Sequence, residues 1–243
     1  MAPRKPLWTL LLLLLLLYTT GAQRAPLPST QQVLEKYVLA LGGREKILKI
    51  TSRVMSGTFE TDGVTNGTVT VVYKTPNLYH SVVNVNGYGV LDSGHDGKGG
   101  WEKSPDQPIH AQTGPDLARS RRELDLHKAV KLAQLYRSIT IKGKGREGGR
   151  SAWLLVAVPV EGHPETMYFE AQSGLLLRVD LQLDTESGPV AVERRYEDYR
   201  DVGGVKVAHT IRFTNPGLSY TLRFHSVQHN APIPAEKLAR PAN

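Results

Sequence analysis

The chain contains no cysteine among its 243 residues. This absence excludes disulfide bonds, thiolate metal sites, a cysteine nucleophile and covalently attached c-type haem. It also leaves no cysteine that could carry a lipid anchor. The stability of the fold must therefore come from packing alone, and we predict no cofactor and no metal site.

Long hydrophobic runs are missing except at the N-terminal end. There, two basic residues precede an apolar run over 7–18, and small residues at Gly21 and Ala22 offer a cleavage site for a signal peptidase. The run is shorter than the ~20 apolar residues that a spanning helix needs. We therefore predict a cleavable signal peptide over 1–22, a flexible leader over 23–28 and export to the periplasm.

Charge of one sign is not concentrated in any block of the chain. Lys and Arg number 30 against 23 Asp and Glu, a formal net charge of +7. Such a surplus suits solubility or transient contact with an anionic membrane surface. Because basic runs with interleaved aromatic residues are missing, we predict no nucleic-acid partner.

The first predicted element is a helix that begins after Ser29 or Thr30, both of which are good N-cap residues. Glycines at Gly42 and Gly43 predict its end, and a short helical piece is expected over 44–50. The apolar positions of the first helix recur at helical spacing and are Val33, Leu34, Tyr37, Val38 and Leu41.

From residue 51 onward the hydrophobic period changes from 3.6 to 2, and turn signals such as Gly203-Gly204 recur at short intervals. Residues 114–136 interrupt this pattern with helix-forming residues, which predicts a helical insertion. A last short helix is expected over 234–238, and residues 29–243 are assigned to one domain. Strands are predicted over 51–60, 67–75, 78–85, 87–94, 99–103, 138–146, 151–160, 165–170, 174–183, 189–199, 205–214 and 217–228.

Several of these strands have one apolar face. Alternate residues from Leu175 to Leu183, from Val205 to Phe213 and from Leu218 to Phe224 are apolar, which predicts three neighbouring strands with one shared surface. About ten amphipathic strands in one antiparallel sheet must twist and curl to cover that surface. The predicted fold is mainly β with a few helices: a curved antiparallel sheet that forms an incomplete half-barrel, with helices plugging its concave side.

Catalytic motifs are weak in this sequence. Ser93, His95 and Asp96 have the residue types of a hydrolase triad, but members of a triad converge from separate loops, and neighbours in a strand point to opposite faces. We interpret the stretch as a hairpin tip. The chain also has no G-x-S-x-G, H-E-x-x-H or phosphate-binding loop motif, so no enzymatic activity is predicted.

Histidines and carboxylates have similarly simple interpretations. His225 and His229 lie ~13 Å apart along an extended strand, too far to share one ion. His209 falls on an apolar face, where a hydrogen-bonded core or rim residue is the favoured interpretation. The carboxylates between 184 and 201 alternate with Arg194, Arg195 and Arg200, which predicts cross-strand charge pairing on a solvated face.

Three stretches resemble the LolA/LolB-like lipoprotein-carrier fold, particularly the outer-membrane lipoprotein-sorting proteins. The stretch HDGKGGWEKSPD over 95–106 is similar to an Asp-Gly turn followed by a tryptophan strand. Residues 149–180 resemble paired strands with a Phe-Glu-x-x-Ser-Gly-Leu turn, and YEDYRDVGGVKVAHTIRF over 196–213 resembles a Tyr-x-Asp-Tyr hairpin. Because these are signatures of turns and strands, they support a fold more strongly than an activity.

The resemblance implies a concave groove that holds a lipid or lipoprotein acyl chain in the periplasm. The helical insertion would fill the empty groove until an acyl chain displaces it. The residues predicted to bind lipid are the apolar ones of the concave face, about half of which are expected to form core instead. They are Met55, Phe59, Val71, Tyr73, Val83, Leu177, Val179, Leu181, Ile211, Phe213, Tyr220, Leu222 and Phe224.

A second interpretation uses the same fold differently. The chain could be an envelope sensor or scaffold that binds a protein partner, as some relatives with this resemblance do. Co-purified lipid favours carriage, whereas a stable protein complex favours the sensor.

Overall fold

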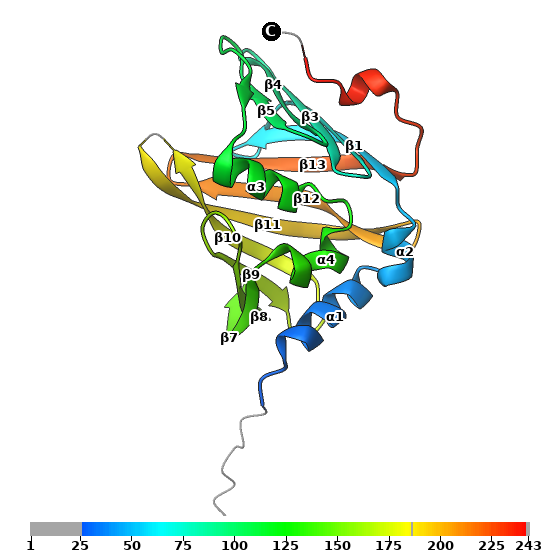
Figure 1. The fold of residues 1–243 in the computed structure, drawn as a ribbon, viewed down its shortest axis with the longest axis vertical. Helices are drawn as coiled ribbons and strands as arrows, with labels where there is room; N and C mark the ends of the chain where they lie inside the picture. Colours follow the sequence, from blue (N-terminus) through cyan, green and yellow to red (C-terminus); the bar gives the residue numbers. More distant parts are fainter. Residues whose placement is uncertain (1–25, 186, 242–243) are drawn as a thin grey trace, which may run out of the picture.

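The computed structural model describes residues 26–185 and 187–241, so the predicted signal peptide lies outside the described residues. In this part of the chain thirteen antiparallel strands form one sheet, and four α-helices lie on it (Figure 1). The strands are β1 (Ser52–Thr61), β2 (Val64–Lys74), β3 (Leu78–Val85), β4 (Gly89–Asp96), β5 (Gly100–Lys103), β6 (His110–Ala111), β7 (Ser138–Glu147), β8 (Arg150–Val158), β9 (Glu165–Glu170), β10 (Leu176–Thr185), β11 (Gly188–Val202), β12 (Val205–Asn215) and β13 (Leu218–His229).

The order of strands in the sheet is β6-β5-β4-β3-β2-β1-β13-β12-β11-β10-β9-β8-β7. Almost every strand therefore pairs with its neighbour in the sequence, as the closely spaced turn signals predict. The exception is the pairing of β1 with β13, which joins the first strand to the last. Among the described residues the two edge strands, β6 and β7, do not pair, so the curved sheet stays open as the predicted half-barrel.

The helices lie on one face of this sheet. They are α1 (Thr30–Ala40), α2 (Arg44–Leu48), α3 (Gly114–Glu123) and α4 (Lys128–Leu135), and a 3-10 helix, η1, covers Ala235–Leu238. The insertion predicted over 114–136 is thus two helices, which pass across the sheet between its two edge strands (Figure 1). No helix among the described residues is long and apolar enough to cross a membrane.

Helix α1 begins where its sequence predicts. The Ser29 hydroxyl oxygen accepts a hydrogen bond from the Gln32 amide at 3.1 Å, and the Gln32 side chain accepts one from the Ser29 amide at 2.8 Å. This capping box satisfies two backbone donors that would otherwise have no partner at the helix start. The buried face of the helix then carries Val33 and Leu34 toward the sheet.

Side chains from the helices and the sheet form three buried clusters. In the first, Val33 and Leu34 of α1 and Leu132 of α4 pack against residues of β8, β9 and β10. A second cluster joins the helices to the turn between β11 and β12, and a third lies on β1, β2, β12 and β13. The first two clusters hold the helices against the sheet by apolar burial, which is worth ~1.5–3 kcal/mol for each fully buried large side chain.

Several details differ from the sequence prediction. The short edge strand β6 has no alternating pattern over its two residues and was not predicted. Strands β10 and β12 are not neighbours, because β11 lies between them, so the predicted shared surface of three adjacent strands is wrong in its order. Strand β2 begins at Val64 and not at the predicted residue 67, so the Asn66-Gly67 pair lies within the strand, at a shift of register against Phe59 and Glu60.

The end of α1 is fixed against the hairpin between β11 and β12. The Lys206 amide donates a hydrogen bond to the Leu41 carbonyl oxygen at 2.8 Å. Gly42 has a φ of 121°, and a Cβ atom at this position would lie 2.1 Å from the backbone oxygen of Gly204. Only glycine meets both the backbone angle and the close approach.

Substituting Gly42 tests this contact. We expect Gly42→Ala to lower the free energy of unfolding by ~2 kcal/mol or more, because the new methyl group forces backbone atoms apart at an unfavourable φ. Gly99→Ala is the matched control, since its Cβ atom would have no neighbour within 4 Å. Urea denaturation of both variants measures the difference; equal stabilities would show that the α1 end is free to shift.

Candidate ligand-binding cavity

A cavity of about 300 Å³ lies between the concave face of the sheet and the helices. Its walls come from α1, α2, α4 and the end of α3 on one side and from the long strands of the sheet on the other. Most of its lining is apolar, including Leu124, Leu126 and Leu132 of the helical insertion. Val130, Leu132 and Tyr136 are also buried core residues, so the insertion is part of the core as well as the cover of the cavity.

Eight of the thirteen residues predicted to bind lipid line this cavity. They come from five strands, β1, β2, β10, β12 and β13, which the sheet brings together. They are Met55, Val71, Tyr73, Val179, Ile211, Phe213, Leu222 and Phe224.

The other five predicted residues lie elsewhere in the core or beside the cavity. Leu177 is buried, but the β9–β10 pairing shifts register between Leu176 and Arg178, and this shift places Leu176 in the cavity wall instead. Leu181 is buried in the first cluster, and Val83 packs against the third.

Phe59 and Tyr220 continue the apolar surface beyond the cavity. The ring of Tyr220 stacks on Phe213 with a centroid distance of 4.6 Å, and Phe59 lies 5.4 Å from Tyr220. These aromatic contacts link the cavity wall to the far end of β1 and β13. Neither ring is among the residues that line the cavity itself.

The charged side chains of the cavity were missed by the sequence analysis, whereas Tyr73 was predicted. Arg194 was grouped with a solvated face, but it lines the cavity, as do Glu123 and Arg53. The alternation of β11 could have revealed Arg194, because it shares the face of buried Val192. Arg53 carries a comparable signal, because it shares the face of Met55 on β1. Glu123 carries none, because only the fold brings the end of α3 to the cavity.

Glu123 and Arg194 form an ion pair across the cavity. An Nη1 atom of Arg194 lies 2.8 Å from Oε2 of Glu123, which joins the end of α3 to β11. The Arg194 guanidinium also lies 5.0 Å from the centre of the Phe213 ring. Burial disfavours the charged form of Glu123, but the positive charges of Arg194, Lys128 and Arg119 outweigh it and lower its pKa to about 2. The pair is therefore charged, and it holds α3 over the cavity.

Arg122, the residue before Glu123, pairs with a different strand of the sheet. Arg122 is buried and lies 3.3 Å from Oε1 of Glu165 on β9, and the Tyr136 hydroxyl donates a hydrogen bond to Oε2 of Glu165 at 2.7 Å. The position of α3 is thus fixed by two ion pairs of opposite polarity, made by consecutive residues.

Burial also acts on the phenols of the cavity. It raises the pKa of Tyr73, and likewise that of Tyr37, well above the usual value for tyrosine. Both phenols therefore stay neutral at physiological pH and are available as hydrogen-bond donors. They give a mostly apolar cavity a limited number of polar groups, as small-molecule sites usually have.

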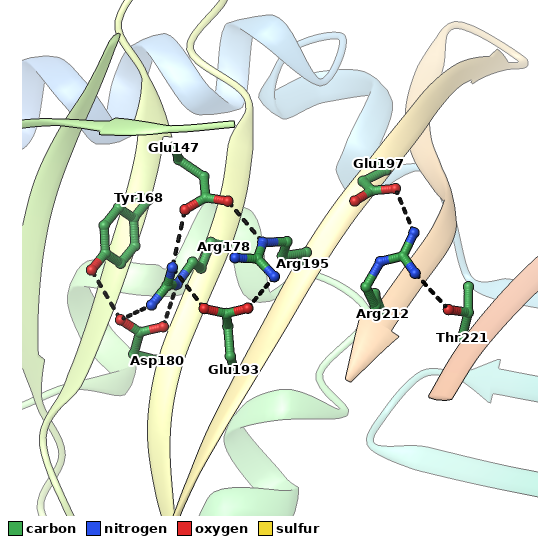
Figure 2. Close-up of polar contacts among 9 residues, drawn as sticks. All are labelled: Glu147, Tyr168, Arg178, Asp180, Glu193, Arg195, Glu197, Arg212 and Thr221. Carbon is green, nitrogen blue, oxygen red and sulfur yellow. Dashed lines mark hydrogen bonds and ion pairs between the residues drawn. The ribbon is translucent and has the colours of Figure 1, made fainter. Parts of the chain in front are cut away.

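The opposite face of the sheet carries the charge pairing predicted from sequence. Glu193 pairs with Arg178 at 2.6 Å and also contacts Arg195, and Glu147 accepts from both arginines (Figure 2). Arg212 on the same face lies 3.6 Å from Glu197 (Figure 2). Arg194, between Glu193 and Arg195 in the sequence, points the other way because neighbours in a strand alternate faces.

The other candidate motifs have structural roles. Asp96 accepts hydrogen bonds from the amides of Lys98 and Gly99, so the Ser93–Asp96 stretch ends in the predicted hairpin tip. His209 is buried, with Nδ1 2.9 Å from the Val207 carbonyl oxygen, as expected of a hydrogen-bonded core residue. The residues that the structure describes contain no group of three or more potential metal ligands.

The Glu123–Arg194 pair predicts a pH dependence of stability. Because the folded-state pKa of Glu123 is about 2, below its ordinary 4.5, the ionised carboxylate stabilises the fold above pH 4.5. This contribution is lost as the pH falls from 4.5 toward 2. At pH 7 we expect Glu123→Gln to cost ~3 kcal/mol, because it leaves Arg194 buried without a counter-charge.

Urea unfolding over a pH series measures this effect. The stability of Glu123→Gln should fall less steeply below pH 4.5 than that of the wild type. Glu161→Gln is the control, because the Glu161 side chain is exposed, and its slope should match the wild type. A wild-type slope in Glu123→Gln would mean that the ion pair does not hold the folded state together.

Solved structures with a similar fold are known. No family model and no curated protein matches the sequence. Among solved structures, a LolA superfamily protein from Nitrosomonas europaea matches with a TM-score of 0.56 and 11% identity, covering 88% of this chain and 99% of that one. A DUF1329 family protein from Desulfovibrio piger matches with a TM-score of 0.55 and 11% identity, covering 86% and 96%. The chain therefore has the fold of LolA superfamily proteins, as its turn and strand signatures predicted.

Proposed function

We propose that the chain binds an acyl chain of a lipid or lipoprotein in the cavity, and that it does so in the periplasm without catalysing a reaction. The observation that carries this proposal is the largely apolar cavity under a helical cover. The predicted signal peptide supports the location. The fold shared with a LolA superfamily protein supports the same class of function.

The energetics favour an acyl chain as the occupant. Transfer of each methylene from water into an apolar site is worth ~0.8 kcal/mol, so eight buried methylenes bring ~6 kcal/mol before the costs of binding. The cavity volume of about 300 Å³ is at the lower end of the ~300–1,000 Å³ typical of ligand sites. A long acyl chain therefore needs the helical cover to move.

The cover is built so that movement has a defined cost. Leu124, Leu126 and Leu132 fill part of the groove, and the Glu123–Arg194 ion pair holds their segment in place. A bound acyl chain replaces the apolar contacts of these leucines, so the free-energy difference between the closed and the ligand-bound arrangement stays small. Release of cargo then follows when the helices return to the groove.

A charge in the cavity wall tests the proposal. We expect Leu222→Glu to abolish binding of a hydrophobic dye with little loss of stability, because this half-buried side chain lines the cavity. Leu218→Glu, on the same strand but 49% exposed, is the matched control and should bind dye normally. Dye fluorescence and thermal unfolding measure the two effects. Undiminished dye binding by a folded Leu222→Glu protein would contradict the assignment of the cavity.

Native mass spectrometry of protein extracted from its own cellular compartment identifies the cargo. We expect an added mass that corresponds to a lipid or an acylated peptide and that is lost on mild delipidation. A stable complex with another protein, without lipid, would instead support the envelope sensor and overturn the carrier proposal.

A further inference from the structure

Arg53 occupies an unusual position in the cavity. It lies near the start of β1, lines the cavity, and stands directly opposite Tyr73 of β2 in the sheet. Its Nε atom donates a hydrogen bond to Nε2 of His229 at 3.0 Å. Burial, with Arg53 as the second cause, lowers the pKa of His229 to about 4, so the imidazole is neutral and accepts this bond.

Unlike its Nε atom, the terminal nitrogens of Arg53 have no hydrogen-bond partner among the described residues. Within residues 26–185 and 187–241, no carboxylate pairs with Arg53 and no acceptor takes a hydrogen bond from its Nη atoms. Arg194 differs, because Glu123 neutralises it within the same cavity. Arg53 is half-buried, and a guanidinium that is partly withdrawn from water without a counter-charge destabilises the fold, which makes the group a candidate for function.

Two phenols add donors beside this cation. Tyr73 and Tyr37 both line the cavity, and the charge of Arg53 acts on the pKa of each, against the dominant effect of burial. Neither hydroxyl group makes a hydrogen bond with the described part of the chain. Arg53, Tyr37 and Tyr73 therefore present several unused donors and no acceptor charge to the cavity.

The other charged side chains of the cavity lining are also mostly positive. The basic side chains in its lining are Arg53, Lys128, Arg194 and Lys206, whereas the acidic ones are Glu123 and Asp125. Both carboxylates already have partners, since Glu123 pairs with Arg194 and Asp125 with Lys131. An entering ligand thus meets a surplus of positive charge within apolar walls.

We propose that the ligand of this cavity is an amphiphile with one anionic head group, which Arg53 binds while the apolar walls hold the hydrocarbon chain. This inference rests on the proposed function and names the chemistry of its cargo. A planar guanidinium binds a carboxylate or phosphate through two parallel hydrogen bonds, and the phenols of Tyr37 and Tyr73 complete the site. A neutral acyl chain, such as an ester, gains the apolar contacts but not these bonds.

A pair of matched probes separates the two contributions. cis-Parinaric acid and its methyl ester have the same fluorescent hydrocarbon chain, and only the acid carries a charge at neutral pH. We expect the delipidated full-length mature protein to bind the acid at least ~10-fold more tightly than the ester. Equal affinities would overturn the inference and leave the proposed function standing, whereas no binding of either probe would overturn both.

Variants then assign the preference to one residue. Arg53→Gln should reduce affinity for the acid by ~10-fold or more and leave affinity for the ester within ~2-fold, which removes the preference. Arg212→Gln, on the opposite face of the sheet, is the control and should keep it. A preference that survives in folded Arg53→Gln would assign the anion to another group and overturn the role of Arg53.

We expect Arg53→Gln to fold. Because no carboxylate of the described residues pairs with Arg53, its neutral replacement should leave the thermal unfolding temperature unchanged or raised. If Arg53→Gln nevertheless fails to fold, Arg53→Lys is the second variant, because it keeps the positive charge and loses the planar guanidinium. Its preference for the acid over the ester should be smaller than that of the wild type but not absent. An unchanged preference in Arg53→Lys would overturn recognition by two parallel hydrogen bonds.

Competition identifies the anionic group. Dodecanoate, dodecyl phosphate and dodecanol share one chain length and displace bound parinaric acid to different extents. Stronger displacement by either anion than by dodecanol supports the inference, and the better anion shows whether the head group is a carboxylate or a phosphate. Equal displacement by all three would contradict it.

Discussion

The open edge of the sheet is the constraint on which the rest of this structure depends. Strands β6 and β7 lie at opposite edges of the sheet and follow each other in the chain, so the segment between them must cross from one edge to the other. Because the concave face is apolar, the crossing segment gains most by packing against it. The result is a helical cover over a cavity, rather than a closed barrel.

The cover combines two kinds of interaction that respond differently to a ligand. Val130, Leu132 and Tyr136 are buried in the core and hold the insertion in place through apolar contacts. The ion pairs of Arg122 and Glu123 set its orientation, because charges in a low-dielectric environment tolerate little displacement. An acyl chain can replace leucine contacts, but it cannot replace a specific ion pair, so opening the cover has a definite electrostatic cost.

The two arginines of the cavity illustrate how context decides the role of one residue type. Arg194 is neutralised by Glu123 and serves the closed arrangement. Arg53 shares a hydrogen bond with a neutral histidine and keeps its terminal nitrogens unused among the described residues. A cavity that holds both arrangements can separate the energy of closure from the binding of a charged group, since each relies on a different arginine.

The sequence by itself determined most of the elements and where they lie along the chain. Period-two alternation and glycine turns located twelve of the thirteen strands, and the bounds of β3 and β9 agree with the prediction to the residue. The apolar faces also placed eight of the thirteen predicted residues in the cavity wall, because alternation assigns each side chain to one face. This local logic failed at Leu177, where a shift of register against β9 reverses the faces.

Only the tertiary structure decided which charges enter the cavity. Arg53, Glu123 and Arg194 are far apart in the chain, so alternation can assign each arginine to a face of its strand but cannot show which charged group meets it there. Whether a charged side chain is buried depends on which strand or helix lies opposite, and that pairing depends on the order of the whole sheet. Sequence periodicity therefore determined the walls of this half-barrel, whereas its polar interior was decided by long-range packing.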